Sequence, residues 1–171
     1  MLSLPAIWKI SEAPKVGARL RPNTAQMDTD EESKSVLFVC TGNTCRSPLA
    51  EAYLKSRRPE WKVDSAGLGA TAGAPAAEHA QKVAKNMGLD LSGHRARSLE
   101  QCTLKQYDHI FVMSSGHLGR LPEGVEGSLL SSVVGKKVSV KDPYGAGSVE
   151  YDRAFKEIVH YLDAFLETGR S

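Results

Sequence analysis

The chain has no long hydrophobic run, few cysteines and no excess of one charge. No stretch approaches the roughly 18 apolar residues that a membrane span needs, so we expect no membrane partner. Its 22 basic and 20 acidic residues give a net charge of +2 without a strong basic stripe, so we expect no nucleic-acid partner. A length of 171 residues suits one domain with a sizeable core.

The three cysteines are Cys40, Cys45 and Cys102. An odd number in a chain of this length does not suit a disulfide scaffold and favours reactive thiols in a reducing compartment. We therefore expect a cytoplasmic protein. Cys102 lies in a predicted helix, where ordinary packing accounts for it.

Residues 1–34 carry no sustained hydrophobic period and end in the acidic run DTDEES. Three prolines and Gly17 interrupt any helix there. We predict a disordered N-terminal extension over 1–34 and a folded domain over 35–171. The first 25 residues hold four basic residues and one acidic residue, which faintly resembles a transit peptide, so an organellar location is the alternative.

From Ser35 onward, apolar runs alternate with helical patterns. The continuous run Val36–Val39 is typical of a parallel strand that is covered on both faces. Further strands are predicted at 61–66, 109–113 and 138–140. This alternation predicts an α/β fold, an open parallel four-stranded sheet flanked by helices in three layers, with ligands at the C-terminal edge of the strands.

Four helices are predicted, over residues 48–57, 76–87, 98–107 and a long stretch after Gly145. Ser47 is expected to cap the first helix, and a capping box from Ser98 to Gln101 to begin the third. The second is expected to bury Met87 and to stop at Gly88. The last helix has the clearest apolar face, formed by Tyr151, Phe155, Ile158, Val159, Leu162 and Phe165.

The segment 36–51, VLFVCTGNTCRSPLAE, places a short polar loop between a strand and a helix. Such a loop turns several backbone N–H groups toward one point and makes an anion cradle. Arg46 adds a bidentate fork to the same anion, and together with the helix dipole it favours Cys40 as a thiolate. A thiolate that faces a phosphoryl group is a nucleophile in position for covalent catalysis. The alternative is a buried structural cysteine beside an unrelated arginine.

The stretch CTGNTCRSPLAE resembles the phosphate-binding loop of the low-molecular-weight protein tyrosine phosphatases, and the similarity extends over about residues 35–167. The resemblance implies that Cys40 forms a cysteinyl phosphate and that Arg46 binds the phosphate. It implies that Ser47 donates a hydrogen bond to the thiolate, although a cap-only role is the alternative. The expected substrate-binding residues are Thr41, Gly42, Asn43, Thr44, Cys45, Ser47 and Tyr144.

Asp142, in the sequence DPYG, matches the general acid of this family. A carboxyl beside the cradle can protonate the leaving atom and then activate water; the alternative is turn chemistry alone. Asn43 tolerates left-handed backbone, which lets the loop fold back. The resemblance implies that Ser65 and His94 hold Asn43, while His79, His109, His117 and His160 are expected to be solvated.

Thr44 is the residue that discriminates between substrates. It stands four residues after Cys40, and the branch that comprises the protein arginine phosphatases also has a threonine at this position. The phosphotyrosine-directed members of the family usually carry isoleucine or leucine there. A second aromatic residue, which tends to follow DPY in those members, is replaced here by Gly145. Both changes remove aromatic packing around the substrate, which favours phosphoarginine. The alternative is that Thr44 is only a β-branched filler.

Two further features depart from, or add to, the family pattern. Cys45 lies in the same loop as Cys40, so it is a candidate to trap oxidised Cys40 as a disulfide. The third strand ends in Met113-Ser114, where the family often has Met-Asp, so an acidic role there is in doubt.

The sequence therefore predicts a metal-independent, cofactor-free phosphatase that acts on phosphoarginine in proteins. A phosphotyrosine phosphatase is the first alternative. Arsenate reduction uses a similar loop but needs further redox cysteines, and Cys102 alone supports it poorly. A non-catalytic phosphoprotein-binding module would not need Cys40, Arg46 and Asp142 together. The expected partners are phosphorylated proteins, and the expected state is a monomer.

Overall fold

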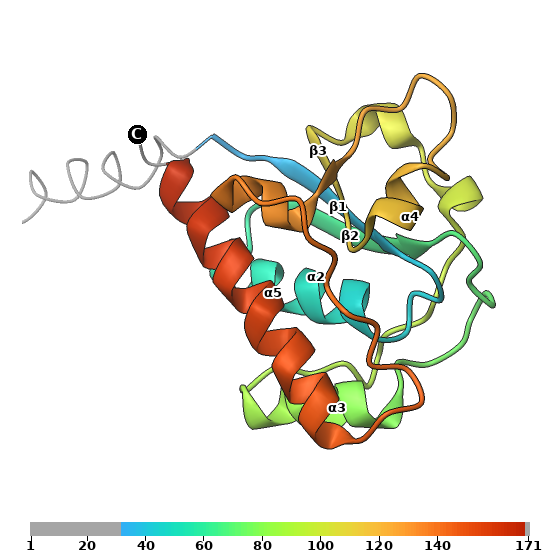
Figure 1. Cartoon of the computed structure of the whole chain (residues 1–171), viewed down its shortest axis with the longest axis vertical. Coiled ribbons are helices and arrows are strands. Elements are labelled where there is room, and N and C mark those ends of the chain that lie inside the picture. The colour runs from blue at the N-terminus through green and yellow to red at the C-terminus, as the bar shows by residue number, and fades with distance from the viewer. Residues whose placement is uncertain (1–31, 170–171) are drawn as a thin grey trace, which may run out of the picture. The chain divides into compact units, whose positions relative to one another are not determined.

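The computed structural model describes residues 32–169 (Figure 1). The chain divides after Ser33, and the fold below is that of the unit that begins at Lys34. The predicted N-terminal extension lies outside the described residues except for positions 32–34. None of the helices within 32–169 combines the length and the apolar character that crossing a bilayer requires.

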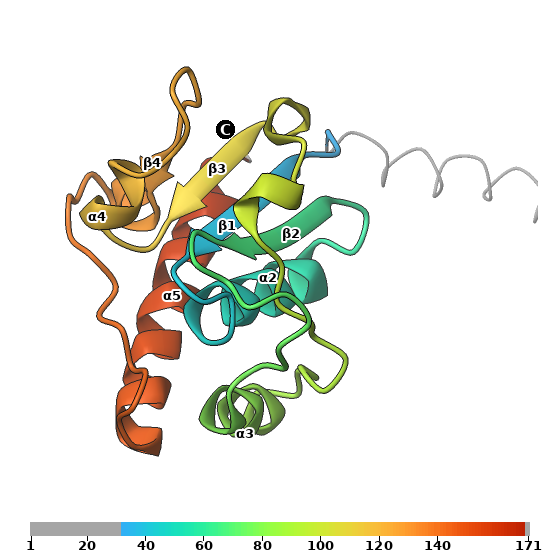
Figure 2. The ribbon, with the colours of Figure 1, turned by 90° about the vertical axis from the view of Figure 1, so that its right-hand side faces the viewer.

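Four parallel strands form a single sheet in the order β2-β1-β3-β4 (Figure 2). They are β1 (Ser35–Cys40), β2 (Lys62–Gly67), β3 (His109–Val112) and β4 (Ser128–Leu129). The predicted α/β architecture is confirmed. Because β1 lies between β2 and β3, its last residue, Cys40, emerges at the C-terminal edge in the middle of the sheet, where open parallel sheets bind ligands.

Helices α2 (Arg46–Arg57) and α5 (Ser148–Thr168) cover one face of the sheet. The opposite face is covered by the short 3-10 turns η2 (Leu99–Gln101) and η3 (Leu104–Gln106) and by the segment 121–125. Helix α3 (Glu78–Asn86) packs with α2 and α5, and α4 (Ser115–Leu118) follows β3. The remaining 3-10 helix, η4 (Leu130–Val134), follows β4 and contacts α5.

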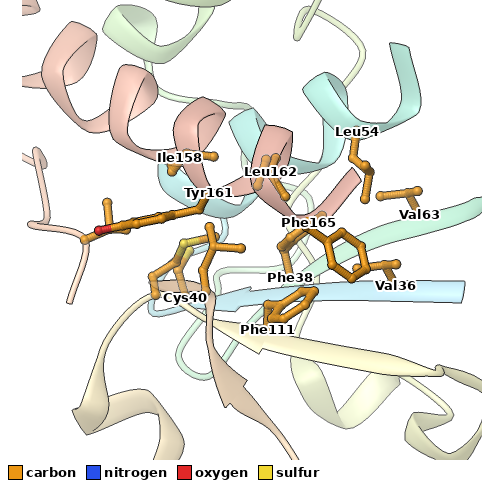
Figure 3. Packing of buried hydrophobic residues seen from close by; sticks show 14 of the residues in the cluster. Val36, Phe38, Cys40, Leu54, Val63, Phe111, Ile158, Tyr161, Leu162 and Phe165 are labelled. Carbon is orange, nitrogen blue, oxygen red and sulfur yellow. The ribbon is translucent and has the colours of Figure 1, made fainter. Parts of the chain in front are cut away.

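Side chains of β1 alternate between the two faces, as a strand requires. Val36, Phe38 and Cys40 lie with the residues of α2 and α5, whereas Leu37 and Val39 lie with the opposite layer. Figure 3 shows the α5 side chains over β1 and β3. Phe111 stacks on Phe38, with ring centroids 6.0 Å apart, and meets Phe165 edge-on at 5.1 Å. This dense packing fixes the end of β1, from which the nucleophile candidate projects.

The predicted strand at 138–140 is wrong, because Val138 and Val140 make no ladder. Ser131 Oγ accepts the Val138 N–H (3.1 Å) and donates to the Val138 carbonyl (2.8 Å), so a side chain takes the backbone groups that a strand partner would use. Val140 donates one backbone bond to the Met113 carbonyl (2.8 Å). The fourth strand is Ser128–Leu129, which is too short to show a period in the sequence.

Three helix predictions also need correction. The capping box of Ser98 and Gln101 is present, but it begins a 3-10 turn rather than a helix that reaches Tyr107. Met87 lies at the end of α3 with 50% of its surface exposed, because Gly88, at φ 74°, turns the chain there. Ser47 does not cap α2, which begins one residue earlier, at Arg46.

Candidate active site

The loop between β1 and α2 has its carbonyl groups fixed from outside. Three of them accept backbone N–H groups of other segments: Cys40 from Leu68 (3.0 Å), Thr41 from Gly69 (2.9 Å) and Thr44 from Ala77 (2.8 Å). The N–H groups of residues 42–45 have no hydrogen-bond partner among the described residues. These N–H groups precede the N-terminus of α2, so they are donors available to an anion.

Asn43 bends this loop back on itself. It has φ 55°, the only non-glycine residue with positive φ in the part of the chain that the structure describes. His94 Nε2 lies 2.7 Å from the Asn43 carbonyl oxygen. The Asn43 side-chain Nδ2 donates to Ser65 Oγ and to Ser47 Oγ, each at 2.9 Å. The Arg97 N–H donates to its Oδ1 (3.0 Å), which fixes the orientation of the amide. The structure thus brings Ser65 and His94 to Asn43, where the family resemblance placed them.

Ser47 links Asn43 to Cys40. Its Oγ lies 2.9 Å from Cys40 Sγ, and all three side chains are buried. Because Ser47 Oγ accepts the Asn43 amide, its own proton is free for the sulfur. The residue that was expected to cap α2 therefore lies at hydrogen-bond distance from the nucleophile candidate, with its proton available to the sulfur. Cys45 occupies the N-cap position, and its side chain makes no capping hydrogen bond to the helix.

Glu51 ends the same hydrogen-bond chain and was not predicted. Ser65 Oγ donates to Glu51 Oε2, which leaves the serine oxygen to accept from Asn43, and Lys55 pairs with Glu51 Oε1 at 2.6 Å. Glu51 stands four residues after Ser47 on α2, so both face the same side of the helix. That spacing was the available signal, but its meaning depends on Ser65, which comes from β2.

Arg46 and Asp142 meet at the rim of the loop. The Arg46 side chain is 5% exposed; Nη1 donates to the Val140 carbonyl (2.9 Å) and Nη2 lies 3.1 Å from Asp142 Oδ2. Its Nε is buried and has no partner among the described residues. Asp142 is half-exposed and also accepts the Tyr144 N–H at 3.1 Å. The DPYG sequence therefore forms a turn and also brings a carboxylate to the cradle.

A pocket of about 390 Å³ opens above the loop. Its floor comes from the loop, and its walls come from the segment after β2 and from the DPYG turn. The lining residues are Cys40, Thr41, Gly42, Thr44, Cys45, Arg46, Gly69, Thr71, Ala74, Asp142 and Tyr144. Tyr144 is the only aromatic residue among them, and 76% of its surface is exposed.

Cys45 lies at the edge of this pocket and is buried. Its Sγ is 3.3 Å from the Tyr151 hydroxyl and 3.6 Å from Thr44 Oγ1. Burial raises the pKa of the Cys45 thiol, and the hydrogen bonds from Tyr151 and Thr44 oppose that rise. Cys102 packs with the residues of the opposite face of the sheet, whereas Cys40 packs with the α5 face.

His117 also belongs to the site, although it was expected to be solvated. It lies on α4 with 5% of its surface exposed, and its Nε2 is 2.8 Å from Thr41 Oγ1. Burial, aided by the charges of Arg46 and Arg120, lowers the pKa of His117 to about 4. A four-residue helix gives no periodic signal, so nothing in the sequence indicated this burial.

The solvated interpretation fails for two of the other three histidines as well. His79 lies 5.3 Å from the Tyr151 ring, and His109 stacks on Phe111 at 5.8 Å. His160 is exposed, as expected. Within residues 32–169 no group of three or more histidine, cysteine or acidic side chains is arranged to hold a metal ion.

Comparison with known proteins gives consistent matches over the folded unit. Residues 35–169 match the family model described as low molecular weight phosphotyrosine protein phosphatase. A protein-arginine-phosphatase of Geobacillus stearothermophilus is 36% identical over 139 residues, which span 77% of this chain and 93% of that protein. A probable low molecular weight protein-tyrosine-phosphatase, EpsP of Ralstonia nicotianae, is 33% identical over 141 residues, or 81% and 97% of the two chains.

Solved structures agree with these matches. The low molecular weight protein tyrosine phosphatase from T. tengcongensis aligns with a TM-score of 0.74 and 36% sequence identity. The alignment covers 80% of this chain and 99% of that one.

Proposed function

The chain belongs to the low molecular weight phosphotyrosine protein phosphatase family, and we propose that its substrates are proteins phosphorylated on arginine. Relatives are named as phosphatases, of protein arginine in one case and of protein tyrosine in others, so the chain is a phosphatase. The preference for phosphoarginine, the residue roles and the cysteinyl-phosphate intermediate are our proposal.

The residues that line the pocket are the observation that favours phosphoarginine over phosphotyrosine. Thr44 and Thr71 line the pocket with hydroxyl groups, and the single aromatic residue, Tyr144, is mostly exposed. A phenyl ring gains little from such walls, because its binding depends on apolar and aromatic contact. A guanidinium carries N–H donors and needs acceptors of the kind that a threonine hydroxyl offers.

In the first proposed step, the Cys40 thiolate attacks phosphorus. The S–P bond forms while the P–N bond of phosphoarginine breaks, and the leaving guanidine nitrogen takes a proton from Asp142. Arg46 and the free N–H groups of residues 42–45 stabilise the charge on the equatorial oxygens. The Ser47 hydroxyl stabilises the sulfur by its hydrogen bond.

In the second proposed step, water attacks the cysteinyl phosphate. Asp142, now a carboxylate, accepts a proton from the water as the new O–P bond forms, and the S–P bond breaks to return the Cys40 thiolate. Inorganic phosphate is released. No group beyond the described residues and water is needed for this balance.

The test compares two substrates that differ only in the phosphorylated residue. Phosphate release is measured from a phosphoarginine peptide and from a phosphotyrosine peptide of otherwise identical sequence at equal concentrations, with Cys40→Ser as the blank. We expect a ratio of kcat/KM that favours phosphoarginine by at least about tenfold, since contacts of this kind discriminate by roughly 1–3 kcal/mol. A ratio that favours phosphotyrosine would overturn the proposed preference for phosphoarginine, but it would not contradict the proposed mechanism.

The phosphotyrosine alternative is supported by Tyr144, which stands at the pocket mouth. The arsenate alternative gains no support, because Cys102 packs on the face of the sheet opposite to Cys40. The cytoplasmic location, its organellar alternative, the monomeric state and the absence of nucleic-acid and membrane partners stay predictions of the sequence.

A further inference from the structure

His117 makes a single side-chain hydrogen bond within the described residues. Its Nε2 lies 2.8 Å from Thr41 Oγ1, and its Nδ1 is buried and has no partner in residues 32–169. An unpaired buried polar atom costs about 1–3 kcal/mol, so an apolar side chain would fill this space more favourably. The hydrogen bond to Thr41 is what distinguishes the imidazole from an apolar side chain at this place.

Thr41 is the residue that follows the nucleophile candidate, and it is held from two sides. The Gly69 N–H donates to its backbone carbonyl at 2.9 Å, from the segment after β2. His117 holds its side chain from α4, beyond β3. The two contacts together fix the direction in which the backbone leaves Cys40, and hence the N–H groups that follow.

The segment that carries His117 also holds the DPYG segment. The Ser115 N–H donates to Ser139 Oγ (3.2 Å), and Val140 donates its N–H to Met113 (2.8 Å). The Val140 carbonyl oxygen in turn accepts a hydrogen bond from Arg46 Nη1. Residues 113–117 therefore touch the phosphate loop on one side and the approach to Asp142 on the other.

We propose that His117 is a positioning residue that orders the phosphate loop through Thr41 and thereby sets the affinity of the loop for the phosphoryl group. This rests on the proposed phosphatase site but not on the choice between phosphoarginine and phosphotyrosine. The ring acts as a neutral hydrogen-bonding group. The charged groups that act on it are Arg46, Arg120 and Asp142, and the two arginines outweigh the carboxylate.

The experiment is a double-mutant cycle between His117→Phe, which fills the space without the hydrogen bond, and Thr41→Val, which removes the hydroxyl. The dissociation constant of inorganic phosphate is measured by calorimetry, and kcat and KM are measured with a small aryl phosphate. We expect each single variant to weaken phosphate binding about 3- to 10-fold, as loss of one net hydrogen bond does. The double variant should bind no worse than either single variant, because the two changes remove one contact.

Two conservative variants sharpen the test. His117→Gln places an amide near the position of Nε2, and Thr41→Ser keeps the hydroxyl, so both should restore most of the phosphate affinity. His160→Phe, on the exposed side of α5, is the matched control and should leave the affinity unchanged.

Either of two results would overturn the proposal. One is wild-type phosphate affinity in Thr41→Val, a change at an exposed residue that does not depend on refilling the core. The other is a loss in His117→Phe that adds fully to that of Thr41→Val, which would make His117 a packing residue. A failure of the phosphoarginine proposal looks different, because phosphate binding and aryl-phosphate hydrolysis persist while phosphoarginine is not cleaved.

Discussion

The Arg46 guanidinium contacts two groups, and a bound phosphoryl group would have to share the guanidinium with them. Its guanidinium holds the Val140 carbonyl through Nη1 and the Asp142 carboxylate through Nη2, while Nε has no partner among the described residues. A dianion in the cradle competes with Asp142 for the same guanidinium. Asp142 would then be released toward the leaving atom, where the proposed general acid is needed.

Asp142→Asn should separate binding from catalysis. Removal of the carboxylate takes away a competitor and a repelling charge, so we expect inorganic phosphate to inhibit at several-fold lower concentration. The same change removes the proton donor, so kcat should fall by about 10²–10⁴. Inhibition constants and kcat with an aryl phosphate check both. Asp152→Asn, at an exposed ion pair with Lys156 on α5, is the control. Weaker phosphate inhibition in Asp142→Asn would contradict the competition.

Thr44→Ile should move the preference toward phosphotyrosine. Isoleucine replaces a hydroxyl in the pocket lining by an apolar wall, which suits a phenyl ring and offers no acceptor to a guanidinium. We expect the ratio of kcat/KM for the two matched peptides to change by at least about tenfold. Thr44→Ser keeps the hydroxyl and should keep the wild-type ratio. Equal ratios in Thr44→Ile and wild type would mean that Thr44 only fills space.

The roles of single residues were predictable where the types and spacing of neighbouring residues in the sequence indicate a site. Cys40, Asn43 and Arg46 stand together in one loop, and their types and spacing indicated a cradle before any fold was known. Glu51 and His117 were missed because their partners, Ser65 and Thr41, come from other segments. Burial of a polar side chain depends on those tertiary contacts, which local spacing does not encode.

Between elements, β2 approaches the backbone of the phosphate-binding loop (residues 40–46) very closely. Gly67 ends β2 opposite Cys40, and a Cβ there would lie 2.6 Å from the Thr41 carbonyl and 3.0 Å from the Asn43 nitrogen. Both contacts are with backbone, which cannot swing aside as a side chain can. A glycine at this position lets the loop lie against the strand.

Gly67→Ala should therefore disturb the cradle. The loop must shift to make room, so we expect phosphate affinity to fall by at least about tenfold and the free energy of unfolding by about 1–3 kcal/mol. Calorimetry and urea unfolding measure the two. Gly93→Ala is the matched control, since a Cβ at Gly93 meets nothing within 4 Å. Unchanged phosphate affinity in Gly67→Ala would show that the approach can relax without cost.

Elements were predictable in proportion to the length of their pattern. Helix α5 and strand β1 have long, unbroken apolar signals and were found. Strand β4 consists of Ser128 and Leu129 alone. The apolar residues at 138 and 140 have the alternating pattern of a strand, which Ser128 and Leu129 do not show. What decided between them was Ser131, whose hydroxyl binds the backbone of Val138. A hydroxyl seven residues away leaves no trace in a local period.

For the folded unit as a whole, the neutral state of His117 links folding to pH. Burial first, and then Arg46 and Arg120, lower its pKa from 6.5 to about 4. Between these values the unfolded chain binds a proton that the folded chain does not, so stability rises with pH across this window. The contribution of His117 is fully present above about pH 6.5 and is lost progressively as pH falls toward 4.

His117→Gln removes this titration while it keeps a hydrogen-bonding group near Thr41. We expect the free energy of unfolding of the wild type to fall relative to that of His117→Gln by up to roughly 3 kcal/mol as pH falls from 7 to 4. Urea unfolding at half-unit pH steps measures both curves. Carboxylates such as Asp108 also lose favourable contacts at acid pH, but they do so equally in both proteins. His160→Gln, at an exposed site, should follow the wild type at every pH. Parallel curves for wild type and His117→Gln would mean that the pKa of His117 is not lowered by folding, so that the imidazole becomes charged at acid pH in the folded chain as it does in the unfolded one.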